Sequence, residues 1–143
     1  MGASIVSVKV ADANESLSTQ FDRVLVDPPC SDLGTLRSRA DVRWRKTSDQ
    51  PAKLAQIQLE ILRSGAAAVA AGGSLLYSTC TITPQENEEV IKEFLADNPQ
   101  FELDNLSPRF PGWKHPVLPQ CLQTLPHMHN TDGFFIAKLR RVK

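Results

Sequence analysis

Phe21-Asp-Arg-Val-Leu-Val-Asp-Pro-Pro-Cys30 is the stretch of sequence that decides the fold. Its apolar residues run almost without interruption to Val26, which is typical of a strand buried on both faces. The two prolines that follow end the strand, because proline cannot donate a hydrogen bond to a central ladder. The pattern therefore predicts a buried strand whose carboxyl end carries Asp27 and Cys30.

The segments on either side of this strand alternate between strand and helix patterns. β-Branched residues alternate in Ser4–Val10, which predicts a strand. A second motif, Thr83-Pro-Gln-Glu86, is a capping box that opens a helix. The predicted strands span residues 4–10, 21–26, 74–79, 101–106 and 133–139, and the predicted helices span residues 51–71 and 84–97.

This order of elements predicts an α/β fold with a mostly parallel sheet. Ligands of such sheets bind at the carboxyl ends of the strands, where Asp27, Cys30 and Cys80 stand. If the two strands are neighbours, both thiols and the carboxylate face one crevice. Residues 107–132 contain five prolines and are expected to be irregular.

Composition narrows the class of protein. The chain has 143 residues, 41% of them hydrophobic, and its 16 basic and 16 acidic side chains leave no net charge. These values fit one globular domain and exclude a wholly basic protein that coats nucleic acid. No apolar run reaches the ~18 residues of a membrane span, and no signal peptide opens the chain. The three cysteines lack a Cys-x-x-Cys pair, so we expect reduced thiols, a cytoplasmic location and no metal site.

Two thiols beside a carboxylate suit nucleophilic attack on an electron-poor carbon. Spacing alone favours the plainer interpretation, in which Cys30 and Cys80 are small buried apolar residues. The sequence around the two cysteines favours the catalytic interpretation instead. The segments that matter are Asp27-Pro-Pro-Cys-Ser-Asp-Leu-Gly34, Asp41-Val-Arg-Trp44, Gly72-Gly-Ser-Leu-Leu-Tyr-Ser-Thr-Cys80, Pro84-Gln-Glu-Asn-Glu88 and Thr131-Asp-Gly-Phe-Phe-Ile-Ala137.

In this order, the segments resemble the RNA cytosine-5 methyltransferases of the NOL/NOP/Sun family, most closely its bacterial 16S rRNA branch. The resemblance covers roughly residues 5–140. It implies a class I, Rossmann-like methyltransferase fold with a C-terminal antiparallel strand. It also implies S-adenosylmethionine as methyl donor and RNA, here 16S rRNA, as partner.

The resemblance implies a role for each matching residue. Cys80 matches the nucleophile that adds to C6 of the target cytosine, and Cys30 matches the cysteine that assists release of the product. Asp27 matches the acidic residue that contacts the cytosine. Asp12, Asp27 and Pro28 match positions beside the cofactor. The target base must leave its stack to reach such a pocket.

A basic segment, Arg37–Lys46, follows the first cysteine. Its side chains could contact RNA phosphates and a base, or it could be a solvated loop with a packed tryptophan. The Asp-x-x-Trp pattern favours the first interpretation, in which this segment is a loop that forms part of the site. The candidate RNA-binding residues are Arg37, Arg39, Arg43, Trp44 and Arg45.

The chain also departs from the family pattern. No Gly-x-Gly turn follows an early strand, so we expect residues 1–143 to be the C-terminal half of a methyltransferase domain that is inactive alone. Asp32 stands where the family commonly has a small neutral residue, and its charge is expected to raise the pKa of a thiol. The edge of strand 21–26 is expected to pair with Ser4–Val10 or to form a homodimer.

Three alternatives remain open at this point. The chain could be a non-catalytic RNA-binding or interaction module derived from this fold. Asp-Pro-Pro also opens the motif of adenine-N6 methyltransferases, although Cys30 replaces their aromatic residue. In DNA cytosine-5 methyltransferases the Pro-Cys cysteine is the nucleophile, which would be Cys30. The Tyr77-Ser-Thr-Cys80 segment favours the RNA type.

Overall fold

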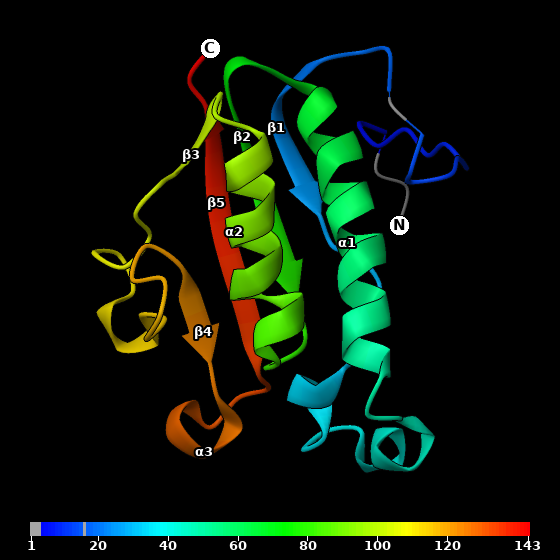
Figure 1. Ribbon diagram of the computed structural model, residues 1–143, viewed down its shortest axis with the longest axis vertical. Helices are drawn as coiled ribbons and strands as arrows, with labels where there is room; N and C mark the ends of the chain where they lie inside the picture. The colour runs from blue at the N-terminus through cyan, green and yellow to red at the C-terminus, as the bar shows by residue number, and fades with distance from the viewer. Residues whose placement is uncertain (1–3, 16) are drawn as a thin grey trace.

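The structure is a computed structural model that describes residues 4–15 and 17–143 (Figure 1). Its strands are β1 (Phe21–Val26), β2 (Val69–Thr79), β3 (Phe101–Leu103), β4 (Leu122–Thr124) and β5 (Phe134–Arg141). Its α-helices are α1 (Gln50–Ala67), α2 (Glu88–Asp97) and α3 (Pro126–His129). Its 3-10 helices are η1 (Leu33–Thr35), η2 (Ala40–Arg45), η3 (Pro84–Glu86) and η4 (Pro111–Trp113).

The five strands form one mixed sheet in the order β1-β2-β5-β3, with β4 also paired to β5. Strand β1 is parallel to β2, whereas β2, β3 and β4 are each antiparallel to β5. Four strands therefore point the same way and β5 alone runs against them, which Figure 1 shows as the red strand. The predicted α/β fold, mostly parallel with a C-terminal antiparallel strand, is confirmed.

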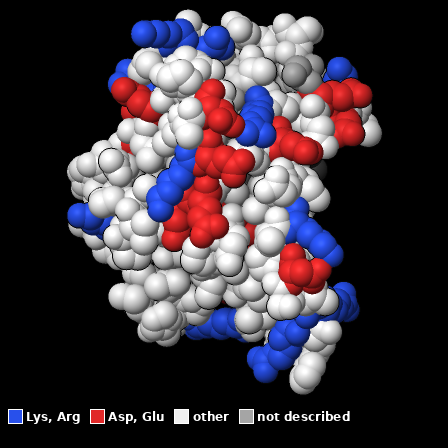
Figure 2. All heavy atoms as spheres, in the orientation of Figure 1, with Lys and Arg blue, Asp and Glu red and all other residues white. Residues whose placement is uncertain are grey.

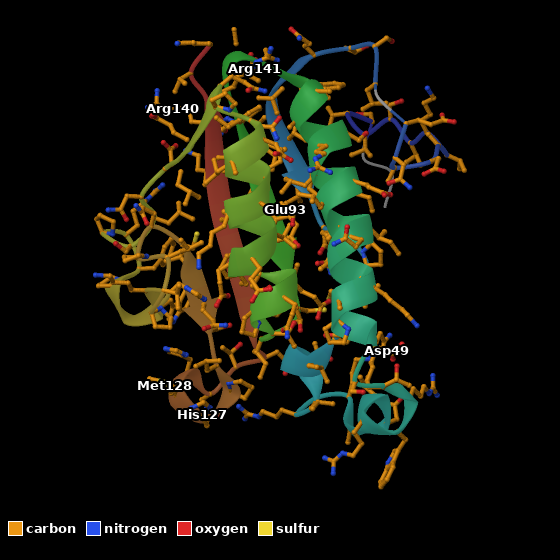
Figure 3. The ribbon with its side chains drawn as sticks, in the orientation of Figure 1. Asp49, Glu93, His127, Met128, Arg140 and Arg141 are labelled. Carbon is orange, nitrogen blue, oxygen red and sulfur yellow. The ribbon has the colours of Figure 1, made fainter. Side chains whose placement is uncertain are left out.

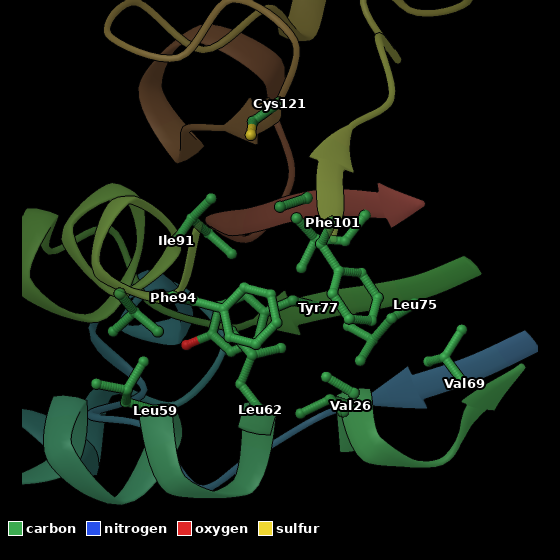
Figure 4. Packing of buried hydrophobic residues seen from close by; sticks show 14 of the residues in the cluster. Val26, Leu59, Leu62, Val69, Leu75, Tyr77, Ile91, Phe94, Phe101 and Cys121 are labelled. Carbon is green, nitrogen blue, oxygen red and sulfur yellow. The ribbon is translucent and has the colours of Figure 1, made fainter. Parts of the chain in front are cut away.

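Helices α1 and α2 lie side by side on one face of the sheet (Figure 1). Their apolar stripes meet the strands in one core that includes Leu62, Leu75, Tyr77 and Phe94, all completely buried (Figure 4). Burial of such side chains stabilises the fold by about 1.5–3 kcal/mol each. The opposite face is less covered, and Leu25 of β1 is 66% exposed there.

The prediction of a strand at Ser4–Val10 is wrong. Residues 4–10 form no strand, and Ile5, Val8 and Val10 are 95%, 86% and 98% exposed. Strand β1 pairs with β2 along one edge, and residues 4–10 do not pair with its other edge. An alternating segment becomes a strand only where a neighbour supplies hydrogen bonds, and here none of the described residues does so. Homodimerisation through the edge of β1 stays a prediction.

The proline-rich stretch 107–132 is more ordered than its sequence suggests. It contains η4, the short strand β4 and the single-turn helix α3. His115 is only 2% exposed, and its Nε2 lies 3.4 Å from Glu88 Oε2. A three-residue strand has too little periodicity to be read from sequence, because its pairing with β5 decides its conformation.

Candidate active site at the carboxyl ends of β1 and β2

The two cysteines meet at one end of the sheet. Cys30 follows β1, and Cys80 directly follows β2. The strands are parallel, and Val26 at the end of β1 lies opposite Tyr77 near the end of β2, so their carboxyl ends lie at the same edge of the sheet. The two Sγ atoms lie 3.1 Å apart, and both side chains are half-buried. The two strands are thus neighbours, and their ends bring the two thiols together as the sequence predicts.

The carboxylate against the sulfurs belongs to Asp32, which corrects the expectation that it would be Asp27. Asp32 Oδ1 lies 3.0 Å from Cys80 Sγ and 3.8 Å from Cys30 Sγ. Its backbone is left-handed, with φ of 57°, a conformation that aspartate tolerates better than most residues. The Lys46 ammonium lies 3.6 Å from Oδ2, the other oxygen of the same carboxylate.

The surroundings of both thiols raise their pKa values. Burial raises the pKa of Cys80 above its ordinary value, and its hydrogen bond to Asp32 raises that pKa further. Burial also raises the pKa of Cys30. The expectation that Asp32 raises a thiol pKa is thus supported, because a carboxylate accepts a hydrogen bond from a thiol but repels a thiolate.

We expect Asp32→Asn to make Cys80 more reactive. The substitution removes a negative charge from the sulfur, and each unit by which the pKa falls raises the thiolate fraction about tenfold near pH 8. The measurement is the rate of alkylation of Cys80 by iodoacetamide, followed by peptide mass spectrometry across pH. Asp41→Asn, at an exposed carboxylate, is the matched control. An unchanged or slower rate in Asp32→Asn would contradict this assignment.

A buried hydrogen-bond network anchored on Glu86 holds the two loops in place. Glu86 is completely buried, although the run 86–93 that contains it is acidic. Its Oε1 accepts hydrogen bonds from the Ser31 backbone N–H at 2.8 Å and from Gln58 Nε2 at 3.0 Å. Its Oε2 accepts from the hydroxyls of Ser31, Thr81 and Thr83. The network ties the residue after Cys30 to the residue after Cys80.

Asn87 fixes the chain on both sides of the second cysteine. Its Oδ1 accepts a hydrogen bond from the Thr79 hydroxyl at 2.6 Å, and its Nδ2 donates to the carbonyl of Thr81 at 3.1 Å. Asn87 is completely buried. The side chain thus holds the backbone that carries Cys80.

A close backbone approach joins the two loops to β5. The Gly34 N–H donates to the Cys80 carbonyl at 3.0 Å, and the Gly133 N–H donates to the Gly34 carbonyl at 2.8 Å. A Cβ on Gly34 would lie 2.0 Å from Gly133 O and 2.9 Å from Cys80 O. Only glycine fits this crossing, because backbone atoms cannot turn away as a side chain can.

Gly34→Ala is therefore expected to lower the free energy of unfolding by about 2–3 kcal/mol, as overpacking in a tight interior does. Chemical denaturation measures the change. Gly112→Ala is the matched control, since a Cβ there meets nothing within 4 Å. Equal stability of the two variants would show that the crossing relaxes at little cost.

The basic segment lies at the same end of the molecule as the cysteines. Trp44 is 84% exposed, which excludes the packed-tryptophan interpretation, and Arg37, Arg39 and Arg43 are exposed too. Arg45 pairs with Asp41 at 3.6 Å. Figure 2 shows Lys and Arg gathered at the lower edge and acidic groups over α2, and Figure 3 places Asp49 and His127 at that same lower end.

The residues expected beside a cofactor lie along β1. Asp12 and Asp27 line a cavity of about 400 Å³ together with Leu17 and Phe21. Pro28 is buried instead. In the part of the chain that the structure describes, no helix is long and apolar enough to cross a membrane.

Comparisons with known proteins show the family to which the chain belongs. The family model described as 16S rRNA methyltransferase RsmB/F matches residues 1–140. A relative from Bacillus subtilis, a probable ribosomal RNA small subunit methyltransferase B, is 45% identical over 99% of this chain and 33% of its own length. The ribosomal RNA small subunit methyltransferase B of Thermus thermophilus is 37% identical over 96% of this chain and 33% of its own.

Solved structures show the same fold. The crystal structure of NSun6 from Pyrococcus horikoshii with SFG matches with a TM-score of 0.82 at 32% identity, over 93% of this chain and 34% of that one. A methyltransferase homolog protein from the same organism matches with a TM-score of 0.69 at 32% identity, over 86% and 40%. The chain spans about a third of the length of the Bacillus subtilis and Thermus thermophilus relatives. The family model covers nearly the whole chain, so the chain belongs to the 16S rRNA methyltransferase RsmB/F family.

Proposed function

We propose that this chain carries the catalytic cysteines of an S-adenosylmethionine-dependent methyltransferase that acts on C5 of a cytosine in 16S rRNA. The observation that carries the proposal is the pair of sulfurs 3.1 Å apart at the carboxyl ends of two parallel strands. Membership of an rRNA methyltransferase family supports the RNA substrate. We propose that the enzyme works in the cytoplasm.

The chemistry explains why a thiol is needed. C5 of cytosine is too weak a nucleophile to take a methyl group unaided. Addition of the Cys80 thiolate at C6 turns C5 into an enamine-like carbon that can attack an electrophilic methyl group. In the proposal, Cys30 then assists loss of the C5 proton, and elimination of Cys80 frees the product. Asp27 contacts the base, where it can assist protonation at N3.

In this scheme Asp32 orients the attacking thiol, because it accepts the hydrogen bond of Cys80 at 3.0 Å. Its partner Lys46 belongs to the basic segment.

The methyl donor of the family is S-adenosylmethionine, which supplies an electrophilic methyl group when bound. The described residues suit one end of S-adenosylmethionine, its nucleoside. Asp12 and Asp27 offer carboxylates beside apolar side chains in the cavity along β1, where a nucleoside can lie. Gly65 is the one glycine among the residues that line this cavity, and it belongs to α1 rather than to a turn that follows a strand.

We therefore expect this chain by itself to bind S-adenosylmethionine too weakly for calorimetry at high micromolar protein. One end of a ligand site provides only part of the contacts that must offset the entropy of binding. Titration of S-adenosylmethionine into the chain measures this directly. A clear binding isotherm would contradict the expectation and would show that the chain assembles a cofactor site unaided.

The basic segment is proposed to hold the RNA. Exposed arginines at 37, 39 and 43 suit phosphates, and the exposed indole of Trp44 offers a face on which a base can stack. A buried tryptophan would have suggested packing instead. Because the segment follows Cys30 and contains Lys46, the partner of Asp32, RNA bound there lies next to the thiols.

Covalent capture tests the proposed function. RNA containing 5-azacytidine is attacked at C6 but releases the thiol slowly, so no methyl donor is required for capture. We expect an SDS-resistant complex with a 16S rRNA fragment, in which mass spectrometry places the RNA on Cys80. An adduct on Cys30 would overturn this assignment in favour of the DNA-type mechanism.

The second candidate is a non-catalytic RNA-binding module. The contact of Asp32 with Cys80 favours it, because this contact keeps the candidate nucleophile protonated. Filter binding of the same RNA distinguishes the two functions. Retained RNA binding with no covalent complex would support the module.

A further inference from the structure

Three side chains that can bind a metal converge on one point at this site. Cys30 Sγ, Cys80 Sγ and Asp32 Oδ1 all lie within 4.8 Å of one another, and all three residues are partly exposed. We propose that they form a binding site for a thiophilic divalent cation, with zinc as the occupant. A zinc ion bound here would also block the Cys80 nucleophile. That consequence rests on the proposed function, whereas the metal site itself does not.

The distances are close to those of a zinc site. In a tetrahedral site, Zn–S bonds of about 2.3 Å separate two sulfurs by roughly 3.8 Å, and an oxygen ligand lies roughly 3.5 Å from each sulfur. The corresponding distances here are 3.1 Å between the sulfurs and 3.0 and 3.8 Å from sulfur to oxygen. Each must change by less than about 1 Å. Because the cluster is partly exposed, solvent can supply the fourth ligand.

Charge favours a cation at this point. With both thiols ionised, Cys30, Cys80 and Asp32 each carry a negative charge around one small space. Lys46 is paired with this carboxylate at 3.6 Å through Oδ2, whereas both sulfurs contact Oδ1. A divalent ion between the three ligand atoms would remove their mutual repulsion, and sulfur ligands select zinc over magnesium or calcium.

The ligands are also held in place by groups around them. Lys46 contacts Oδ2 of Asp32, which leaves Oδ1 directed at both sulfurs. The loops that carry the cysteines are tied by the Gly34–Cys80 backbone hydrogen bond and by the Ser31 and Thr81 hydroxyls, 2.8 Å apart. Such second-shell contacts orient metal ligands and contribute to affinity. None of these contacts needs to break when an ion binds.

Titration with cobalt(II) tests the site. Cobalt takes tetrahedral thiolate sites like those of zinc and reports its sulfur ligands through a thiolate-to-metal charge-transfer band. In the reduced, metal-free chain we expect this band to saturate at about one ion per chain and to disappear when zinc is added. Zinc is also expected to protect Cys30 and Cys80 from alkylation, which mass spectrometry measures in the unaltered chain.

Variants assign the band to its ligands. Cys30→Ser and Cys80→Ser are each expected to weaken binding at least about 100-fold, and Asp32→Asn at least about tenfold. Cys121→Ala is the matched control, because Cys121 is completely buried in the core and outside the cluster. It should bind cobalt as the unaltered chain does.

Two results would overturn the metal site. One is a folded, reduced chain that shows no thiolate–cobalt band. The other is unchanged binding in both Cys30→Ser and Cys80→Ser, which would place the ion elsewhere. Capture of 5-azacytidine RNA in metal-free buffer tests the proposed function separately. RNA capture without a cobalt band would therefore refute only the metal site, and a cobalt band without RNA capture would refute only the catalytic role.

Discussion

Cys80→Ser is expected to abolish the SDS-resistant complex between this chain and RNA that contains 5-azacytidine. A serine hydroxyl stays protonated near neutral pH and is a far weaker nucleophile than a thiolate, so addition at C6 should slow by a factor on the order of 10³ or more. The substitution changes one atom at a half-buried position, so the fold should survive. Denaturing gel electrophoresis with labelled RNA measures the covalent fraction.

Cys30→Ser is the informative comparison for Cys80→Ser. Its sulfur lies 3.1 Å from that of Cys80, but the proposal gives it a role in release of the product. The complex should therefore form and persist in Cys30→Ser. Cys121→Ala should behave like the unaltered chain. A complex that survives in Cys80→Ser but disappears in Cys30→Ser would exchange the two roles.

Glu86→Ala is expected to lower the free energy of unfolding by about 3–4 kcal/mol. The completely buried carboxylate accepts hydrogen bonds from one backbone N–H, three hydroxyls and one amide, and alanine leaves all of these donors without their acceptor. An unpaired buried donor costs about 1–3 kcal/mol, although water entering the space offsets part of that cost. Chemical denaturation followed by circular dichroism measures the change.

Glu93→Ala provides the matched control on α2. Glu93 is an exposed acidic residue on the face of the helix shown in Figure 3, and its loss should change stability by no more than about 0.5 kcal/mol. Glu86→Gln should fall between the two, because it keeps one acceptor oxygen and the shape of the side chain. A Glu86→Ala variant as stable as Glu93→Ala would refute the anchoring role of the network.

The network also connects stability to the site. Glu86 holds the backbone N–H of Ser31, next to Cys30, and the hydroxyl of Thr81, next to Cys80. Loss of the carboxylate should therefore loosen both thiols together. In Glu86→Ala we expect weaker cobalt binding and a slower RNA capture, whereas Glu93→Ala should leave both unchanged.

The sequence by itself determined the strand at Phe21–Val26, the parallel direction of most strands in the sheet and the close approach of the Cys30 and Cys80 thiols. A buried apolar run that ends in two prolines leaves little choice of conformation, and parallel neighbours necessarily bring their carboxyl ends together. The apolar periodicity placed both helices, because it extends over several turns, but residues 69–71, predicted as the end of the first helix, open strand β2, and α2 begins at Glu88 after the 3-10 turn η3.

The tertiary structure alone decided the rest, because each remaining feature depends on a partner distant in sequence. Ser4–Val10 has the pattern of a strand but no neighbour, so it forms none. Glu86 sits in an acidic run, yet donors from three other segments make it a buried anchor. Asp32 contacts Cys80, 48 residues away, because two loops cross where only glycine fits at Gly34. Local patterns record what a residue prefers, whereas packing decides which preferences are satisfied.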